Sequence, residues 1–140
     1  MTGRDLRSHF AFDDMINWIK SRLDSFRYAL RGVRLLLRYE THARIHLLVT
    51  ILVVAMGVVF SLSSVEWGLI ILVTGLVWTA EAFNTAIERV VDLASPERHE
   101  LAEKAKDLAA GGVLLAAVAA VIVGLLLFGP RILLFFRPGV

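Results

Sequence analysis

The chain has 140 residues, of which 57% are hydrophobic and 20% are charged, with a formal net charge of +2 and a mean hydropathy of +0.69. A soluble domain of this size is usually about 45 to 50% apolar, so the excess excludes most water-soluble folds and favours a protein embedded in lipid. The sequence has no cysteine, which excludes disulfide scaffolds, zinc or iron–sulfur clusters and thiol nucleophiles.

Residues 1–46 form the basic end of the chain, with nine Lys and Arg against five Asp and Glu. Between residues 13 and 45, apolar side chains recur every three or four positions, which predicts one apolar stripe on a helix with arginines beside it. The stripe consists of Met15, Ile19, Leu23, Phe26, Leu30, Val33 and Leu37. A helix lying on an anionic membrane surface has this pattern, and so has an ordinary helix packed against a bundle.

Three segments are predicted to cross the membrane: residues 47–65, 67–93 and 108–128. The first and third have no charged residue, and about 20 residues are enough to span a hydrocarbon layer of about 30 Å. Residues 94–107 then form a polar loop between the second and third crossings. No repeat or long linker divides the chain, so we expect one membrane domain over residues 1–140.

Basic residues flank the crossings at 22–44 and 89–107, whereas the turn at 61–66 has none. The excess of Lys and Arg in cytoplasmic loops therefore predicts that the N-terminus and the 94–107 loop face the cytoplasm. Arg131 and Arg137, on the opposite side, count against this orientation but are outnumbered. Gly129 and Pro130 are expected to end the last helix.

The second crossing carries four polar residues on one face. At about 100° per residue, Glu81, Asn84, Glu88 and Asp92 fall near 0°, 300°, 340° and 20°. Ionised carboxylates at this depth are costly unless they are paired, hydrated or metal-bound. The face could be neutralised by a hard divalent cation such as Mg²⁺, or by basic side chains, for which Arg44, Lys104 and Lys106 are available.

Glu81 is the deepest acid, because it follows an uninterrupted apolar stretch from Trp67 to Ala80. A carboxyl group in such surroundings suits a general base or a proton relay, although a hydrogen bond to a neighbouring helix is the simpler alternative. Glu88 is interpreted as a metal ligand rather than half of a structural ion pair. The loop pairs basic and acidic residues, as magnesium polyphosphate binding requires, but a solvated helix surface does so too. The sequence has no phosphate-binding GxxxxGK[ST] loop, GxGxxG motif or protein-kinase signature.

Four segments resemble the prokaryotic diacylglycerol kinase family, which includes the undecaprenol kinases. They are EAFNTAIERVVD at 81–92, HELAEKAKDLAAGGVLL at 99–115, FRYALRGV at 26–33 and ETHARIH at 40–46. The resemblance covers roughly residues 22–130, and the spacing of NTAIE from AKDLAAG is highly specific. It implies an all-α integral membrane fold of three transmembrane helices and an amphipathic surface helix, assembled as a homotrimer with shared active sites in the bacterial inner membrane.

The activity implied by the resemblance is transfer of the γ-phosphate of ATP to a lipid hydroxyl with Mg²⁺, and no nucleic-acid partner is expected. By position, Glu81 matches the catalytic base and Asn84 a residue that orients substrate, while Glu40 and Glu88 match the acids that hold magnesium and ATP phosphates. Nucleotide-contacting positions are matched by Tyr28, Glu97, Arg98, His99, Lys106 and Asp107. Asp92 matches a supporting acid, and Arg44 is expected to support the site as a positively charged residue nearby.

Departures within these motifs bear on the substrate. ARIH, NTAIE and KAKDLAAG are similar to the branch in which undecaprenol is a frequent acceptor, whereas diacylglycerol is the acceptor in the other branch. That other branch has an acid at the position of His46, so its role does not transfer. Ser21, with Arg22 adjacent, stands where a nucleotide-contacting arginine would be expected. Two other hypotheses remain: a small proton-coupled transporter or channel with Glu81 as the relay acid, and a noncatalytic adaptor that binds anionic lipid.

Overall fold

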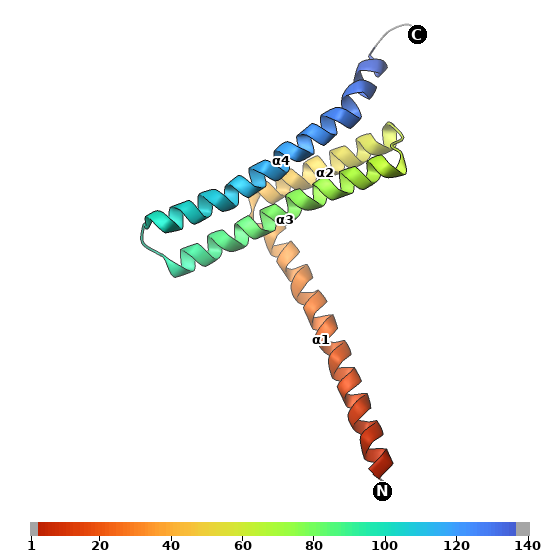
Figure 1. The fold of residues 1–140 in the computed structure, drawn as a ribbon, viewed down its shortest axis with the longest axis vertical. Coiled ribbons are helices and arrows are strands. Elements are labelled where there is room, and N and C mark those ends of the chain that lie inside the picture. The colour runs from red at the N-terminus through yellow and green to blue at the C-terminus, as the bar shows by residue number, and fades with distance from the viewer. Residues whose placement is uncertain (1–2, 137–140) are drawn as a thin grey trace. The chain divides into compact units, whose positions relative to one another are not determined.

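The structure, a computed structural model, describes residues 3–136, with side chains described from residue 15. It contains four helices, α1 (Gly3–Tyr39), α2 (Thr41–Val59), α3 (Ser64–Ala94) and α4 (Glu100–Phe135), and no strand within residues 3–136 (Figure 1). Helices α2, α3 and α4 are each long and apolar enough to cross a membrane. The predicted all-helical membrane fold with three spans is therefore confirmed. The chain divides into two units, residues 1–39 and 40–140, described separately below.

The first unit is the single helix α1. It begins ten residues before the predicted start at residue 13, and the side chains of residues 13 and 14 lie outside the described part. Six residues of the predicted stripe have exposed side chains: Met15, Ile19, Leu23, Phe26, Leu30 and Val33. The helix ends at Tyr39 because Glu40 adopts an extended backbone conformation, φ −103° and ψ 120°, as the N-cap of α2. Residues 41–45, predicted to continue the surface helix, instead form the first turn of α2.

The ends of the helices in the second unit differ from the predicted crossings. Helix α2 occupies 41–59 rather than 47–65, and the expected loop at 94–107 shortens to residues 95–99 because α4 already begins at Glu100. Hydropathy locates the part of a helix that matches the hydrocarbon layer, and a helix continues beyond it through polar turns that carry their own capping groups. Such a group begins α4, where His99 Nδ1 accepts a hydrogen bond from the Leu101 amide at 3.2 Å.

A tight turn at residues 60–63 joins α2 to α3. Ser61 has a φ of 48°, and the turn is closed by a hydrogen bond from the Leu62 amide to the Gly57 carbonyl at 3.0 Å. The Trp67 ring packs so closely on Gly57 that a Cβ there would lie 2.7 Å from Cη2. A small apolar core surrounds this turn, with Leu62, Ile70 and Phe128 buried at its centre.

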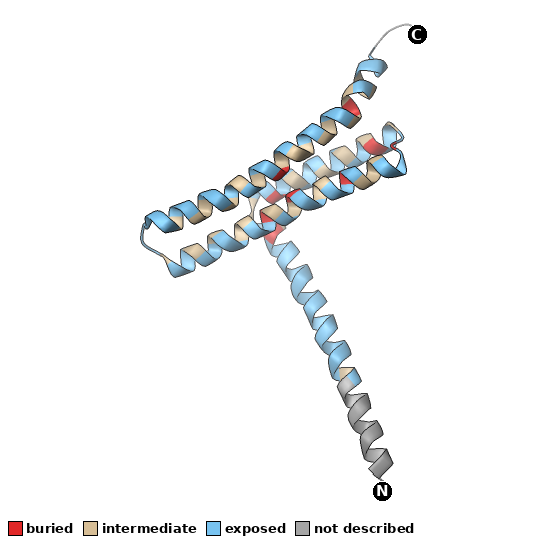
Figure 2. Ribbon diagram, in the orientation of Figure 1, coloured by how far each residue is buried: buried red, intermediate tan, exposed pale blue. Residues whose placement is uncertain are grey.

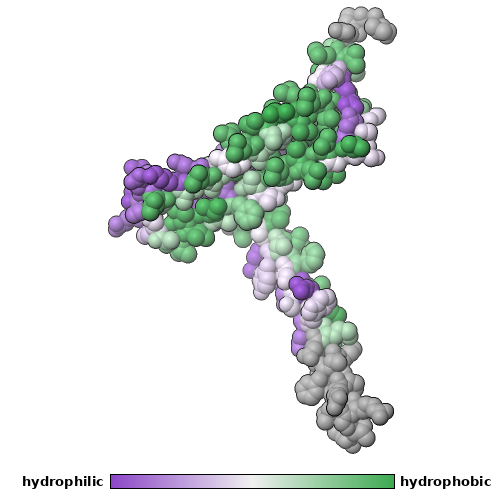
Figure 3. All heavy atoms as spheres, in the orientation of Figure 1, coloured by the Kyte–Doolittle hydropathy of each residue, from purple (hydrophilic) through white to green (hydrophobic). Residues whose placement is uncertain are grey.

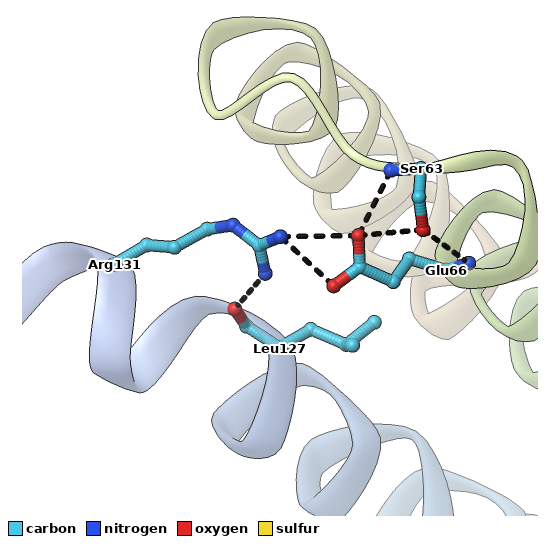
Figure 4. Close-up of polar contacts among 4 residues, drawn as sticks. All are labelled: Ser63, Glu66, Leu127 and Arg131. Atoms are coloured by element: carbon cyan, nitrogen blue, oxygen red, sulfur yellow. Dashed lines mark hydrogen bonds and ion pairs between the residues drawn. The ribbon is translucent and has the colours of Figure 1, made fainter.

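The predicted helix end at Gly129 and Pro130 is wrong, because α4 continues through Pro130 to Phe135. Proline removes one helical hydrogen bond and crowds the preceding turn, so the extension needs other support. Arg131 provides it (Figure 4): Nη1 donates to the Leu127 carbonyl at 2.7 Å, and Nη2 donates to both Glu66 oxygens at 2.8 and 3.0 Å. Arg131, which counted against the predicted orientation, is thus neutralised within the chain.

Glu66 also caps the start of α3. Its carboxylate accepts from the Ser63 amide and hydroxyl, and its own amide donates to the Ser63 hydroxyl, which completes a capping box (Figure 4). The turn between α2 and α3 and the end of α4 are therefore held by one carboxylate.

Apolar side chains cover the middle of the three-helix unit, and hydrophilic ones gather at the α3–α4 connection and at the opposite end (Figure 3). Few residues of this unit are buried within the chain (Figure 2), and most large apolar side chains are exposed. Among the described side chains, the buried charged residue is Glu81, with 3% of its surface exposed.

Candidate active site

The polar face predicted on α3 contains a linked pair and a buried acid. Asn84 Nδ2 donates to Glu88 Oε1 at 3.1 Å, so these two side chains lie together as their spacing of four residues predicts. Glu81 lies one turn before Asn84 and is almost completely buried. The Asn84 Oδ1 atom is also buried and has no hydrogen-bond partner within the described chain. A buried acceptor without a partner is costly, which makes it a candidate ligand contact.

Glu81 faces α2. Its Oε2 atom lies 3.9 Å from His46 Nε2, and the two side chains are 5% and 21% exposed. His46 also lines a mainly apolar cavity of about 350 Å³ between α2, α3 and α4, whose walls include Val53, Val77 and Ala120. The deep acid is therefore placed beside an imidazole that borders an apolar space.

Two further contacts link α2 and α3 on either side of this pair. Trp78 Nε1 donates to Thr50 Oγ1 at 3.1 Å, and Arg89 Nη2 donates to Glu40 Oε1 at 2.8 Å. In these three contacts the residue numbers fall along α2 as they rise along α3, as expected for two antiparallel helices. The contacts therefore follow one another along the two helices. We call them the cross-helix ladder: Thr50–Trp78, His46–Glu81 and Glu40–Arg89.

A second group of predicted residues lies at the α3–α4 connection. Lys106 Nζ forms an ion pair and hydrogen bond with Asp92 Oδ1, which ties α4 to the end of α3. Both line a cleft of about 220 Å³ that is also bordered by Glu97, Arg98 and His99. Five residues assigned to the site from sequence are therefore gathered around one polar cleft.

Other predicted residues are not brought to that cleft. Asp107 lines a separate hollow on α4 with Lys104, Gly111 and Gly112. Tyr28 belongs to the other unit of the chain. Glu81 and Asp92 are eleven residues apart on one helix, which corresponds to about 16 Å along its axis at a rise of 1.5 Å per residue.

The acids of the site can be compared with what Mg²⁺ needs. No three His, Asp or Glu side chains are grouped to hold a metal ion within the described residues. Mg²⁺ is usually bound through one or two carboxylates, with waters and substrate phosphates completing its shell. Glu88, which is hydrogen-bonded to Asn84, and Glu40 are acids of the right type for this binding mode, so the chemistry of each side chain is compatible with magnesium.

Three residues of the cross-helix ladder were not assigned a role from sequence: Thr50, Trp78 and Arg89. His46 was noted only for the acid that it replaces. Arg89 had a detectable signal, because a basic residue directly after Glu88 near a membrane boundary calls for an acidic partner. Thr50 and Trp78 had none, since a threonine and a tryptophan in an apolar segment are ordinary there.

Comparison with known proteins bears on the activity. The family model described as prokaryotic diacylglycerol kinase matches residues 27–128. An undecaprenol kinase of Bacillus subtilis is 39% identical over 119 residues, which cover 85% of this chain and 97% of that protein. A diacylglycerol kinase of a Synechocystis strain is 44% identical over 112 residues, 79% of this chain and 64% of that longer protein. A diacylglycerol kinase of Escherichia coli is 34% identical over 95 residues, 68% of this chain and 78% of that protein.

These relatives are all named as kinases, and nothing in the comparisons supports the transporter or channel alternative. The match to the family model includes the polar face of α3, the α3–α4 connection and α4 as far as Phe128. The chain belongs to the prokaryotic diacylglycerol kinase family and is a lipid kinase of the membrane.

Proposed function

We propose that this protein transfers the γ-phosphate of Mg-ATP to the hydroxyl group of a membrane lipid alcohol, undecaprenol or diacylglycerol. The observation that carries the proposal is Glu81, a carboxyl group 3% exposed on a helix whose apolar neighbours are mostly exposed. A buried membrane acid is expected to be functional unless it is fully paired. The names of the relatives supply the two acceptors.

In the proposed reaction, Glu81 accepts the proton of the lipid hydroxyl while the hydroxyl oxygen forms a bond to the γ-phosphorus. The bond from that phosphorus to the bridging oxygen of ATP breaks, and ADP leaves with the electron pair. The unpartnered Oδ1 of Asn84 is available to accept a hydrogen bond from another donor at the site, such as a bound water, and its amide nitrogen donates to Glu88 Oε1 at 3.1 Å. Positioning and charge neutralisation account for most of the catalysis of phosphoryl transfer, so few groups are needed.

Glu88 and Glu40 are the proposed holders of magnesium, together with phosphate oxygens and water. The ion would neutralise charge that develops on the transferred phosphoryl group. Arg89 holds Glu40 Oε1 at 2.8 Å. Since a carboxylate has two oxygens, this contact leaves the other available.

The nucleotide is proposed to occupy the polar cleft at the α3–α4 connection, where Lys106 and Arg98 supply positive charge for phosphates. Asp92 would hold Lys106 in place until the nucleotide arrives. The remaining proposed nucleotide contacts are Glu97, His99, Asp107 and Tyr28, and Arg44 is proposed to support the site as a positively charged residue.

Assembly and location complete the proposal. The active sites are shared between the protomers of a homotrimer in the bacterial inner membrane, with the N-terminus and the site on the cytoplasmic side. The basic flanks of the crossings support this orientation, and pairing with Glu66 neutralises Arg131, one of the two arginines that count against it. Chemical crosslinking in mild detergent should yield a species of three chains, and a largest species of two would contradict the shared site.

The acceptor is tested by transfer of labelled γ-phosphate to undecaprenol and to diacylglycerol, in parallel mixed micelles with Glu81→Gln as the blank. Preference for one acceptor assigns the substrate, and chelation of Mg²⁺ should abolish transfer to it. No transfer to either lipid by folded wild-type protein would contradict the proposal.

A further inference from the structure

The surroundings of Glu81 point to a second residue in the proposed reaction. A base buried to this extent must be held at a fixed angle, and its charge must be stabilised before the acceptor binds. The structure places the imidazole of His46 beside it, with Nε2 at 3.9 Å from Oε2. A histidine of α2 thus meets the acid of α3 inside the apolar part of the protein.

The position of His46 is set by the ladder contact one turn away. The Thr50 hydroxyl donates to the His46 carbonyl at 2.7 Å and accepts from Trp78 Nε1 at 3.1 Å. This links the backbone of His46 to α3 through two successive hydrogen bonds. Since Trp78 precedes Glu81 by one helical turn, the same contact fixes which turn of α2 lies opposite the acid.

The chemistry of imidazole suits the task. One of its ring nitrogens carries a hydrogen in the neutral form and both do in the charged form, so Nε2 can donate to a carboxylate. The separation of 3.9 Å is longer than a direct hydrogen bond. Contacts of a catalytic base are often long in the absence of substrate and shorten in the reacting complex. His46 borders a mainly apolar cavity, and an interaction between a donor and a carboxylate is stronger in apolar surroundings than in water.

We propose that His46 is a positioning residue for Glu81: it aims the carboxylate at the acceptor hydroxyl and stabilises its charge by donating from Nε2. It acts through Glu81 and does not itself exchange a proton with the substrate. The inference rests on the proposed role of Glu81 as the base. Residues at the α3–α4 cleft are not involved, so ATP binding should be independent of His46.

The test compares His46→Ala and His46→Gln with His42→Ala, a matched control in which an exposed histidine one turn earlier in α2 is removed. We expect His46→Ala to lower kcat for lipid phosphorylation by roughly 10- to 100-fold, by analogy with the loss of a group that orients a metal ligand. The KM for ATP should stay within about twofold. His46→Gln, whose amide can still donate, should recover a substantial part of kcat.

A structural role alone would not give this pattern. Normal kcat in His46→Ala, or His46→Gln no more active than His46→Ala, would overturn the inference. If His46→Ala fails to fold, Thr50→Val provides a second test, because it removes the hydroxyl that holds the His46 carbonyl. Its kcat should fall by roughly two- to tenfold with the KM for ATP unchanged, and an unchanged kcat would overturn the inference.

Assay of Glu81→Gln in parallel separates the two possible failures. Full activity in Glu81→Gln would remove the proposed base and this inference with it. Loss of activity in Glu81→Gln, combined with full activity in His46→Ala, would refute the role of His46 and leave the proposed function intact.

Discussion

Gly57→Ala should destabilise the hairpin that carries the active site. A Cβ at this position would lie 2.7 Å from Trp67 Cη2, 2.9 Å from Cζ2 and 3.2 Å from Leu62 Cδ1. Ordinary contact begins at 3.4 Å, so the indole ring must withdraw by 0.7 Å, the difference from its closest distance. Trp67 belongs to the packed cluster at the turn and cannot move without disturbing its neighbours.

The magnitude follows from two opposing effects. Overpacking of this kind costs about 1 to 3 kcal/mol. Alanine in place of glycine within a helix contributes about 1 kcal/mol in the other direction. Gly68→Ala is the matched control, because a Cβ there meets nothing within 4 Å and only the helix effect remains. The free energy of unfolding should therefore be lower in Gly57→Ala than in Gly68→Ala by about 1 to 3 kcal/mol.

Unfolding by denaturant in detergent micelles, followed by tryptophan fluorescence, measures this difference. The signal is well placed because Trp67 is one of the three tryptophans and lies at the contact. If Gly57→Ala unfolds with the same free energy as Gly68→Ala, the close packing described at the turn is incorrect.

Three further substitutions test other contacts. Glu66→Gln keeps the capping group but removes the ion pair with Arg131, and should lower the free energy of unfolding by about 1 kcal/mol. If Glu66→Gln lowers that free energy by the same amount in an Arg131→Met background, the ion pair contributes nothing. Trp78→Phe removes a cross-helix hydrogen bond and should cost about 1 kcal/mol in the same assay, whereas no loss would argue against the ladder. Lys106→Met should raise the KM for ATP by roughly tenfold in steady-state assays, with Lys104→Met as the control; equal KM values for both would exclude Lys106 from the nucleotide site.

Much of the fold follows from the sequence, since the three crossings are determined by long apolar segments whose exposure to water would be unfavourable. The errors fall at helix ends. Pro130 was predicted to end the last helix, but Arg131 supports the backbone beyond it through the Leu127 carbonyl and Glu66, a partner 65 residues away. The residues around Pro130 do not predict a contact with a partner so distant in the sequence.

The candidate site was also predictable only in part, because spacing along the sequence determines contacts within a helix but not between helices. The faces of one helix follow from residue spacing, so the contact between Asn84 and Glu88 could be expected. The contacts between helices depend on their register, which periodicity does not determine. The pairings of His46 with Glu81 and of Thr50 with Trp78 therefore emerged only from the structure.

The central claim is that the buried carboxyl group of Glu81 is the general base of a lipid kinase. It is tested most directly by kcat for labelled phosphate transfer from Mg-ATP in Glu81→Gln, compared with Glu66→Gln, the same substitution in the first turn of α3. Loss of a general base should lower kcat by about 10²- to 10⁴-fold in Glu81→Gln, while folded Glu66→Gln should retain the wild-type value. Wild-type kcat in Glu81→Gln, or an equal loss in both variants, would contradict the claim.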